Sequence, residues 1–291
     1  MSMKGIKIDM TIYHVDVFSK VPYAGNGLTV VFYENKLDAK EMQKIACEFK
    51  QFETIFLQRL DEECYMAKIF TVEEELDFAG HPILGAAAVV HREKFEEESE
   101  KEITFKLNKG DIVTTSKKCG DYYEVTMNQG NPQWILEVSN EWKAQYCKAL
   151  NLSMSDLSEG YPMEVVSTGL PYLLVPIKSE LEKAKIVCDN FEALLAKNKA
   201  KFVYVFDVNK TEGRTWDNFG LVEDVATGSA AGPMGAYLYK HGCFKKEELI
   251  EINQGQYVGR PSVIKVSCKE ETGEIFVSGD VKVIMKGELY E

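Results

Sequence analysis

The sequence lacks the local patterns by which proteins commonly bind metals or pair thiols. Its seven cysteines are odd in number and widely scattered: Cys47, Cys64, Cys119, Cys147, Cys188, Cys243 and Cys268. No two of them stand within four positions, which excludes a zinc knuckle and a C-x-x-C redox pair. The four histidines form no H-x-x-H or H-x-x-x-H pair: His14, His81, His91 and His241. We therefore expect reduced thiols and no metal.

Basic charge, a nucleotide-binding loop and long apolar runs are also missing. The chain has 46 acidic against 34 basic residues, a formal charge of −12, whereas broad nucleic-acid contact needs a basic face. Residues 25–27, Gly-Asn-Gly, do not continue into a dinucleotide or Walker loop. The apolar run at 83–90 is too short to span a bilayer, and the first ten residues lack the apolar core of a signal peptide. We expect a cytoplasmic protein with no cofactor and with neither nucleic acid nor membrane as a partner.

Secondary-structure patterns are regular over the 291 residues. Strands are predicted where β-branched and aromatic residues gather, at 11–18, 28–33, 53–57, 65–70, 103–107, 111–115, 122–127, 164–168, 172–177, 201–208, 263–266 and 275–277. Helices are predicted at 38–50, within 77–94 after a short turn, within 223–242 after two acids and a turn of tiny residues, and from Asp189 to about residue 197. Asp38 and Glu41 have the spacing of a capping box, and 95–101 is predicted to be a charged loop.

The two halves of the chain repeat one plan. The pattern D-x-A-x5-G at residues 77–85 recurs at 224–232, an offset of 147 (224 − 77) at all three positions. The breaker cluster NQGNP predicts a boundary, so we expect 1–127, completed by strand 280–291, as one domain and 128–279 as the other. Each domain is expected to be a curved mixed sheet packed on a small-residue helix, an α+β fold. Facing turn-plus-helix elements would line an inter-domain cleft with two helix N-termini.

The stretch 223–242, EDVATGSAAGPMGAYLYKHG, predicts an approach of backbone to a ligand. Its small residues have almost no side chain that would keep a ligand away from the backbone. The first N–H groups of a helix also attract a carboxylate. The alternative is a helix whose small face packs on a neighbour.

A few polar residues stand out as candidates for chemistry. Glu53 begins the apolar strand ETIFL, where a carboxyl group is expected to favour its neutral form and to suit proton transfer; alternatively it lies in water at the strand's start. His81, between Gly80 and Pro82, either contacts a ligand or satisfies a turn carbonyl. Asp224 either binds a ligand or only caps a helix. Ser229 has no partner at the spacing of a Ser-His-Asp hydrolase.

Several segments in order resemble the PhzF-like phenazine-biosynthesis family over nearly the whole chain. They are VDVFSKVPYAGNGLTVV, EMQKIA…FETIF, DFAGHPILGAAAVV, VSTGLPYLLVPI, EDVATGSAAGPMGAYLYKHG and QGQYVGRPSVIKV. The resemblance implies a diaminopimelate epimerase-like fold: two similar domains, each a barrel-like sheet around a central helix, with the site in the cleft between them. It also implies a cofactor-free isomerase, often a homodimer.

The resemblance assigns roles to particular positions. The family's proton-moving glutamate falls on Glu53, and its substrate-contacting histidine, aspartate and serine fall on His81, Asp224 and Ser229. Gly80 and Gly228 are expected to supply backbone N–H groups.

The sequence also departs from the family's pattern. Ala79 and Ala226 occupy the positions where thiol-using relatives carry cysteines, so this chain is similar to the cysteine-free branch. Phe52, Val225 and Gly27 replace residues common in the family, and Phe52 could reshape the pocket beside Glu53.

The leading interpretation is an isomerase that moves a proton within a small carboxylate-bearing substrate, with Glu53 as general acid and base. One alternative is a small-molecule binding or protein-interaction module without turnover. Another is an amino-acid racemase. Such an enzyme needs two acid–base groups on opposite faces of a carbon, and this chain lacks the two thiols that serve this purpose in thiol-using relatives.

Overall fold

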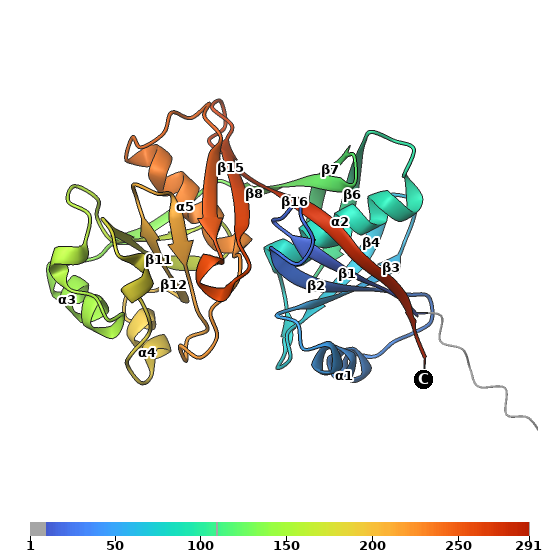
Figure 1. Cartoon of the computed structure of the whole chain (residues 1–291), viewed down its shortest axis with the longest axis horizontal. Coiled ribbons are helices and arrows are strands. Elements are labelled where there is room, and N and C mark those ends of the chain that lie inside the picture. Colours follow the sequence, from blue (N-terminus) through green and yellow to red (C-terminus); the bar gives the residue numbers. More distant parts are fainter. Residues whose placement is uncertain (1–9, 109, 291) are drawn as a thin grey trace, which may run out of the picture. The chain divides into compact units, whose positions relative to one another are not determined.

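The computed structural model describes residues 10–108 and 110–290, and its internal contacts divide the chain into two compact units. Unit 1 comprises the described part of Met1–Met127 together with the C-terminal segment from Gly279. Unit 2 comprises Asn128–Ser278. Residues 1–9 and Glu291, which the predicted first domain included, lie outside the described residues. Two long strands carry the chain from one unit to the other (Figure 1).

Unit 1 is a closed barrel of eight strands. They are β1 (Met10–Val17), β2 (Asn26–Tyr33), β3 (Thr54–Arg59), β4 (Cys64–Phe70), β6 (Glu100–Leu107), β7 (Gly110–Cys119), β8 (Tyr122–Gly130) and β16 (Ile275–Leu289), in that spatial order. The barrel closes because β16 also pairs with β1, antiparallel. The β2–β3 and β4–β6 pairs are parallel, and the short β5 (Glu75–Leu76) pairs with β4.

The barrel surrounds the helix α2 (Gly80–Lys94), in which every residue from Gly80 to His91 is buried. Its small residues let the strands approach on all sides. A Cβ atom on Gly85 would overlap Leu28 and lie 3.1 Å from the Cγ2 atoms of Val15 and Val17. Only glycine therefore fits where the helix crosses β1 and β2.

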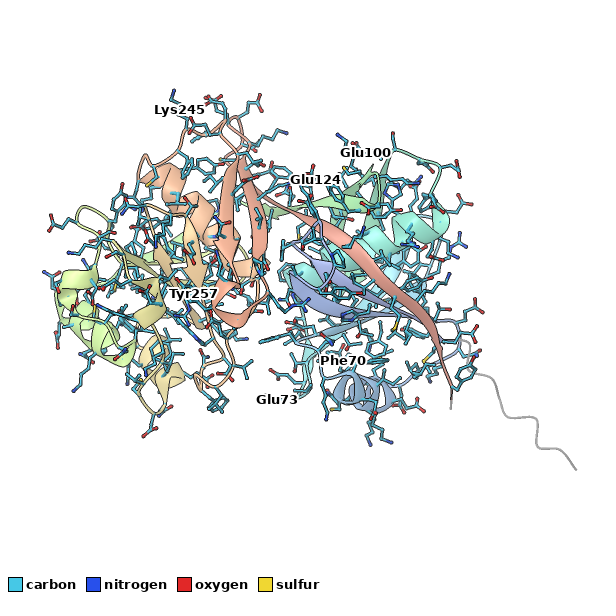
Figure 2. The ribbon with its side chains drawn as sticks, viewed as in Figure 1. Phe70, Glu73, Glu100, Glu124, Lys245 and Tyr257 are labelled. Carbon is cyan, nitrogen blue, oxygen red and sulfur yellow. The ribbon has the colours of Figure 1, made fainter. Side chains whose placement is uncertain are left out.

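A second helix, α1 (Ala39–Phe49), packs on the outside of the barrel. The capping box is confirmed: Asp38 accepts hydrogen bonds from the N–H groups of Lys40 and Glu41, and Glu41 accepts from the N–H of Asp38. Its apolar face, with Met42 and Ala46 buried, covers a cluster that includes Phe70, labelled in Figure 2.

Unit 2 has the same plan, with strands gathered around a buried helix. Its strands are β9 (Gln133–Glu137), β10 (Glu164–Ser167), β11 (Pro171–Ile177), β12 (Phe202–Asp207), β13 (Glu212–Arg214), β14 (Ile250–Gln254) and β15 (Ser262–Cys268), and β15 neighbours β16. The central helix α5 (Gly228–Lys240) packs on β10, β11 and β15. A Cβ atom on Gly235 would overlap Val266 of β15, so this contact also requires glycine. The predicted α+β fold, with strands around a central helix, is confirmed.

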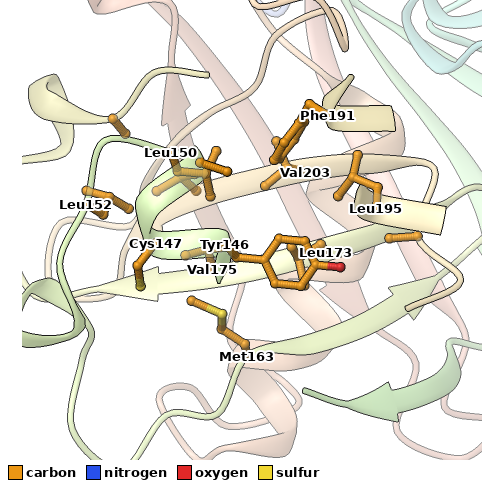
Figure 3. Close-up of a cluster of buried hydrophobic side chains, with 14 of the residues drawn as sticks. Tyr146, Cys147, Leu150, Leu152, Met163, Leu173, Val175, Phe191, Leu195 and Val203 are labelled. Carbon is orange, nitrogen blue, oxygen red and sulfur yellow. The ribbon is translucent and has the colours of Figure 1, made fainter. Parts of the chain in front are cut away.

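Unit 2 also contains an extensive cluster of buried apolar side chains. The helices α3 (Asn140–Ala149) and α4 (Phe191–Ala196) supply Tyr146 and Phe191, which are fully buried against strand residues such as Leu173 (Figure 3). Three short 3-10 helices complete the unit: η1 (Met154–Asp156), η2 (Leu181–Lys183) and η3 (Gln256–Val258).

Several predicted boundaries are wrong. The helix expected from Asp189 is capped by Asn190 in a left-handed conformation and spans only Phe191–Ala196. β6 begins at Glu100, inside the expected loop at 95–101, and β8 runs into the breaker cluster as far as Gly130. The sequence patterns also missed β5, β9, β13, β14 and α3. The missed strands have two to five residues each, too few for a periodic signal.

Candidate active site

Glu53 and His81 meet in unit 1. Glu53 is the residue immediately before β3, and His81 is the second residue of α2. The strand start is fixed by the pairing of Thr54 with β2 on one side and β4 on the other. His81 Nε2 lies 3.3 Å from Glu53 Oε2, and the two side chains are only 6% and 15% exposed. The structure thus places a carboxyl group and an imidazole together, although Glu53 lies just outside the strand predicted to contain it.

His81 is a neutral imidazole at physiological pH. Burial lowers the pKa of His81 from its ordinary value of 6.5 to about 3, because the charged ring would lose its hydration. A neutral ring has one N–H donor and one acceptor nitrogen, so it can exchange a hydrogen bond with a carboxyl group in either of its protonation states. The sequence predicted His81 in a turn before the helix, whereas it lies buried in the first turn of the helix itself.

The lowered pKa makes stability depend on pH in a defined window. When the pH falls below about 6.5, the unfolded chain protonates this histidine and the folded chain does not, so folding loses stability until the pH reaches about 3. Urea unfolding at pH 7.5, 5.5 and 4.5 should therefore show wild type losing more stability than His81→Gln over this range. The exposed-face control Lys44→Gln should follow wild type. Parallel pH profiles for wild type and His81→Gln would contradict the burial of a neutral ring.

The start of α2 has the polarity that suits an anion. Its N-cap, Ala79, has no side-chain oxygen to accept from the first N–H groups, and the first turn contains no acidic residue. The N–H groups of Gly80 and His81 have no acceptor within the helix, while Pro82 has no N–H at all. The positive end of the helix thus lies directly beside the Glu53–His81 pair.

The corresponding turn in unit 2 precedes α5. Its N-cap is Thr227, not Asp224, and the Thr227 hydroxyl is hydrogen-bonded to Asp224 Oδ2. Gly228 and Ser229 are the first two helical residues, and their N–H groups have no acceptor within the helix. Ser229 Oγ lies 2.8 Å from the hydroxyl of Tyr172 on β11. Unit 2 therefore brings Asp224, Gly228 and Ser229 together around one helix start.

Sequence reasoning missed four residues that shape this turn: Tyr172, Arg214, Thr227 and Gln254. Tyr172 stands in the segment VSTGLPYLLVPI, but nothing local marks its hydroxyl as a partner of Ser229. Gln254 is completely buried and is hydrogen-bonded to both Asp224 and Thr227. Tyr172 and Gln254 are 27 to 57 positions along the chain from the residues they bond, beyond the reach of any local pattern.

Within residues 10–108 and 110–290, no group of three or more His, Cys, Asp or Glu side chains is arranged to hold a metal ion. In the same part of the chain no helix is long and apolar enough to cross a membrane.

Comparisons with known proteins agree over nearly the whole length. The family model described as phenazine biosynthesis-like protein, PhzC-PhzF, matches residues 15–287. An uncharacterized isomerase of Clostridium acetobutylicum is 32% identical over 295 residues, which cover 96% of this chain and 97% of the relative. The trans-2,3-dihydro-3-hydroxyanthranilate isomerase of Pseudomonas chlororaphis is 31% identical, with coverage of 94% and 97%.

Among solved structures, a predicted epimerase from Pseudomonas aeruginosa superposes with a TM-score of 0.90. It is 42% identical in sequence, and the match covers 96% of this chain and 98% of that one. The match supports the barrel-around-helix architecture of both units. The chain therefore belongs to the phenazine biosynthesis-like family and is an isomerase of the PhzF type.

Proposed function

We propose that the protein moves a proton within a small carboxylate-bearing substrate and that Glu53 is the general acid and base. The observation that carries this proposal is the buried approach of the Glu53 carboxyl group to the neutral His81 ring, at 3.3 Å beside the start of α2. A general acid–base needs a carboxyl group near its reacting proton and shielded from water, and this environment supplies the shielding.

The proposed reaction needs one proton and no change in oxidation state. The Glu53 carboxylate takes a proton from a carbon α or allylic to an acid-stabilised centre, and the C–H electron pair enters the adjacent unsaturated system. The Glu53 carboxyl group then gives the proton to a different carbon of that system, so the product is an isomer. The N–H groups of Gly80 and His81 hold the substrate carboxylate and stabilise negative charge that develops in the transition state.

In unit 2 we propose that Asp224, Gly228 and Ser229 bind the substrate. The N–H groups at the start of α5 suit an anionic or carbonyl oxygen. The Asp224 carboxylate, supported by the Thr227 hydroxyl, suits a hydrogen-bond donor on the substrate.

The candidate substrate is trans-2,3-dihydro-3-hydroxyanthranilate or a cyclic acid of the same class. A relative is named for the isomerisation of that compound. The compound is a small unsaturated carboxylate, the kind of molecule that the proposed site suits. Phe52 adjoins Glu53 and is half-buried, so it is placed to alter the substrate's fit. Within this class of substrate, trans-2,3-dihydro-3-hydroxyanthranilate is therefore the first compound to test.

The test is isomerisation in deuterated water. Incubation with trans-2,3-dihydro-3-hydroxyanthranilate should change its absorbance spectrum, and mass spectrometry should find solvent deuterium in the product. Proline and diaminopimelate should show neither exchange nor loss of optical rotation, because a racemase needs a second group opposite the first. Binding without exchange in any cyclic or amino-acid-like carboxylate would refute the isomerase proposal and favour a binding module.

A further inference from the structure

Gln254, the last residue of β14, is completely buried beneath the turn that precedes α5. We propose that it is a positioning residue that fixes the Asp224 carboxylate and the start of α5. This inference rests on the proposed role of Asp224 in substrate binding. Gln254 itself is placed to act through Asp224 and Thr227, both of which it bonds.

The orientation of the Gln254 amide is determined by its neighbours. Its Oε1 accepts from the backbone N–H of Thr227 at 3.2 Å, and a backbone N–H can only donate. Its Nε2 donates to the backbone carbonyl of Asp224 at 3.0 Å, and a carbonyl can only accept. The two amide ends therefore cannot be exchanged without losing both bonds.

This fixed orientation also sets the direction of the Thr227 hydroxyl. Gln254 Nε2 lies 3.1 Å from Thr227 Oγ1 and donates to it. The single hydroxyl proton of Thr227 is then free to donate to Asp224 Oδ2, with which Thr227 is bonded. A chain of two hydrogen bonds thus leads from Gln254 to one oxygen of the Asp224 carboxylate.

The remaining partner of Gln254 lies on the far side of the amide. The hydroxyl of Tyr204, a residue buried in β12, donates to Gln254 Oε1 at 2.9 Å. Burial raises the pKa of Tyr204, so this hydroxyl stays protonated and remains a donor. All four hydrogen bonds of the amide are therefore directional, and three of them lead to the turn.

The backbone next to Gln254 packs against the same turn. Gly255 has a φ of +88°, and a Cβ atom there would overlap the Arg260 carbonyl oxygen and lie 2.7 Å from that of Val225. Val225 follows Asp224 directly, so the chain after β14 contacts the turn through backbone as well as through the Gln254 amide. Close packing of this kind limits how far the turn can move.

The test is the near-isosteric change Gln254→Glu, which keeps the Oε1 acceptor and replaces the amide NH2 group with a carboxyl oxygen. With trans-2,3-dihydro-3-hydroxyanthranilate we expect KM to rise about tenfold, which is the effect of losing one hydrogen bond between Asp224 and the substrate. We expect kcat to change less than about threefold. The matched control is Asn198→Asp, the same amide-to-acid change at a buried residue of unit 2 that bonds Tyr146. It should leave KM unchanged.

A double-mutant cycle tests whether Gln254 acts through Asp224. Once Asp224→Asn has weakened substrate binding, adding Gln254→Glu should raise KM by much less than about tenfold, because coupled residues are not additive. Additive effects, or an unchanged KM in Gln254→Glu, would overturn the inference. If Gln254→Glu does not fold, Thr227→Val, which removes the intervening hydroxyl, carries the same expectation and the same refutation.

Hydrogen exchange separates this inference from the proposed function. Gln254→Glu should speed amide exchange in peptides covering residues 224–229 at least about tenfold, whereas Asn198→Asp should not. If wild type neither isomerises nor exchanges the compound, the proposed function fails while faster exchange in the turn still supports the positioning role. Unchanged exchange in the turn would refute the positioning role whatever the activity.

Discussion

Replacing Glu53 with glutamine is expected to lower kcat by about 10²–10⁴-fold, the usual contribution of a positioned general acid–base. The amide has nearly the same shape as the carboxyl group but cannot accept a proton from carbon and return it. Because Glu53 lies outside β3 and retains some exposure, the fold should survive the change. The measurement is isomerisation of trans-2,3-dihydro-3-hydroxyanthranilate together with deuterium incorporation.

Two comparisons make the Glu53 result specific. Glu48→Gln removes one negative charge from the exposed side of α1 in the same unit and should leave kcat unchanged. Glu53→Asp keeps the carboxyl group but retracts it by one methylene, so it should retain more activity than Glu53→Gln. If Glu53→Gln exchanged solvent deuterium as fast as wild type, Glu53 would not be the proton-moving group.

Much of the secondary structure and helix packing was predictable because it depends on short patterns in the sequence. The capping box at Asp38 and Glu41 needs only four residues, and the structure forms it as expected. The glycines that end the D-x-A-x5-G pattern do so for a packing reason: at Gly85 and Gly232 a Cβ atom would overlap a neighbouring side chain. Boundaries were less predictable, since Asn190 caps α4 in a left-handed conformation that no pattern around Asp189 indicates.

The candidate site was predictable in part. Apolar neighbours distinguished Glu53 from 45 other acidic residues, and small residues marked the starts of α2 and α5. The approach of Glu53 to His81 depends on how β3 packs on α2, a tertiary contact that periodicity does not encode. The role of Gln254 was not predictable either, because the sequence around a buried glutamine at the end of a short strand does not distinguish it from a polar residue in a loop.

The largest effect on stability is expected at Arg214. Its guanidinium forms a two-bond pair with Glu223, Nε to Oε1 at 2.9 Å and Nη2 to Oε2 at 2.6 Å, and both side chains are only 9% exposed. Nη1 donates to the carbonyls of Leu181, Glu182 and Ala184. Arg214→Met would leave a buried carboxylate and these carbonyls without their donor, which is expected to cost about 3–5 kcal/mol of unfolding free energy.

Two aromatic rings also pack against the guanidinium. Its central carbon lies 4.8 Å from the Trp216 ring and 4.4 Å from the ring of Tyr257, labelled in Figure 2. Arg214→Lys should therefore rescue little of the loss, because an ammonium group neither forms the two-bond pair nor stacks. Urea unfolding followed by circular dichroism provides the measurement.

The pairing itself is tested by a cycle with Glu223→Gln. The cost of Arg214→Met is expected to arise from a buried Glu223 carboxylate left without its guanidinium. Neutralising Glu223 in the Arg214→Met background should then recover part of the lost stability, so the effects of the two changes should be less than additive. Lys183→Met, which breaks the exposed ion pair with Glu180 in the same unit, should change stability little. Because Glu223 directly precedes Asp224, Arg214→Met should also speed amide exchange at 224–229. A stability loss in Arg214→Met no larger than that of Lys183→Met would mean that the buried pair does not hold this turn.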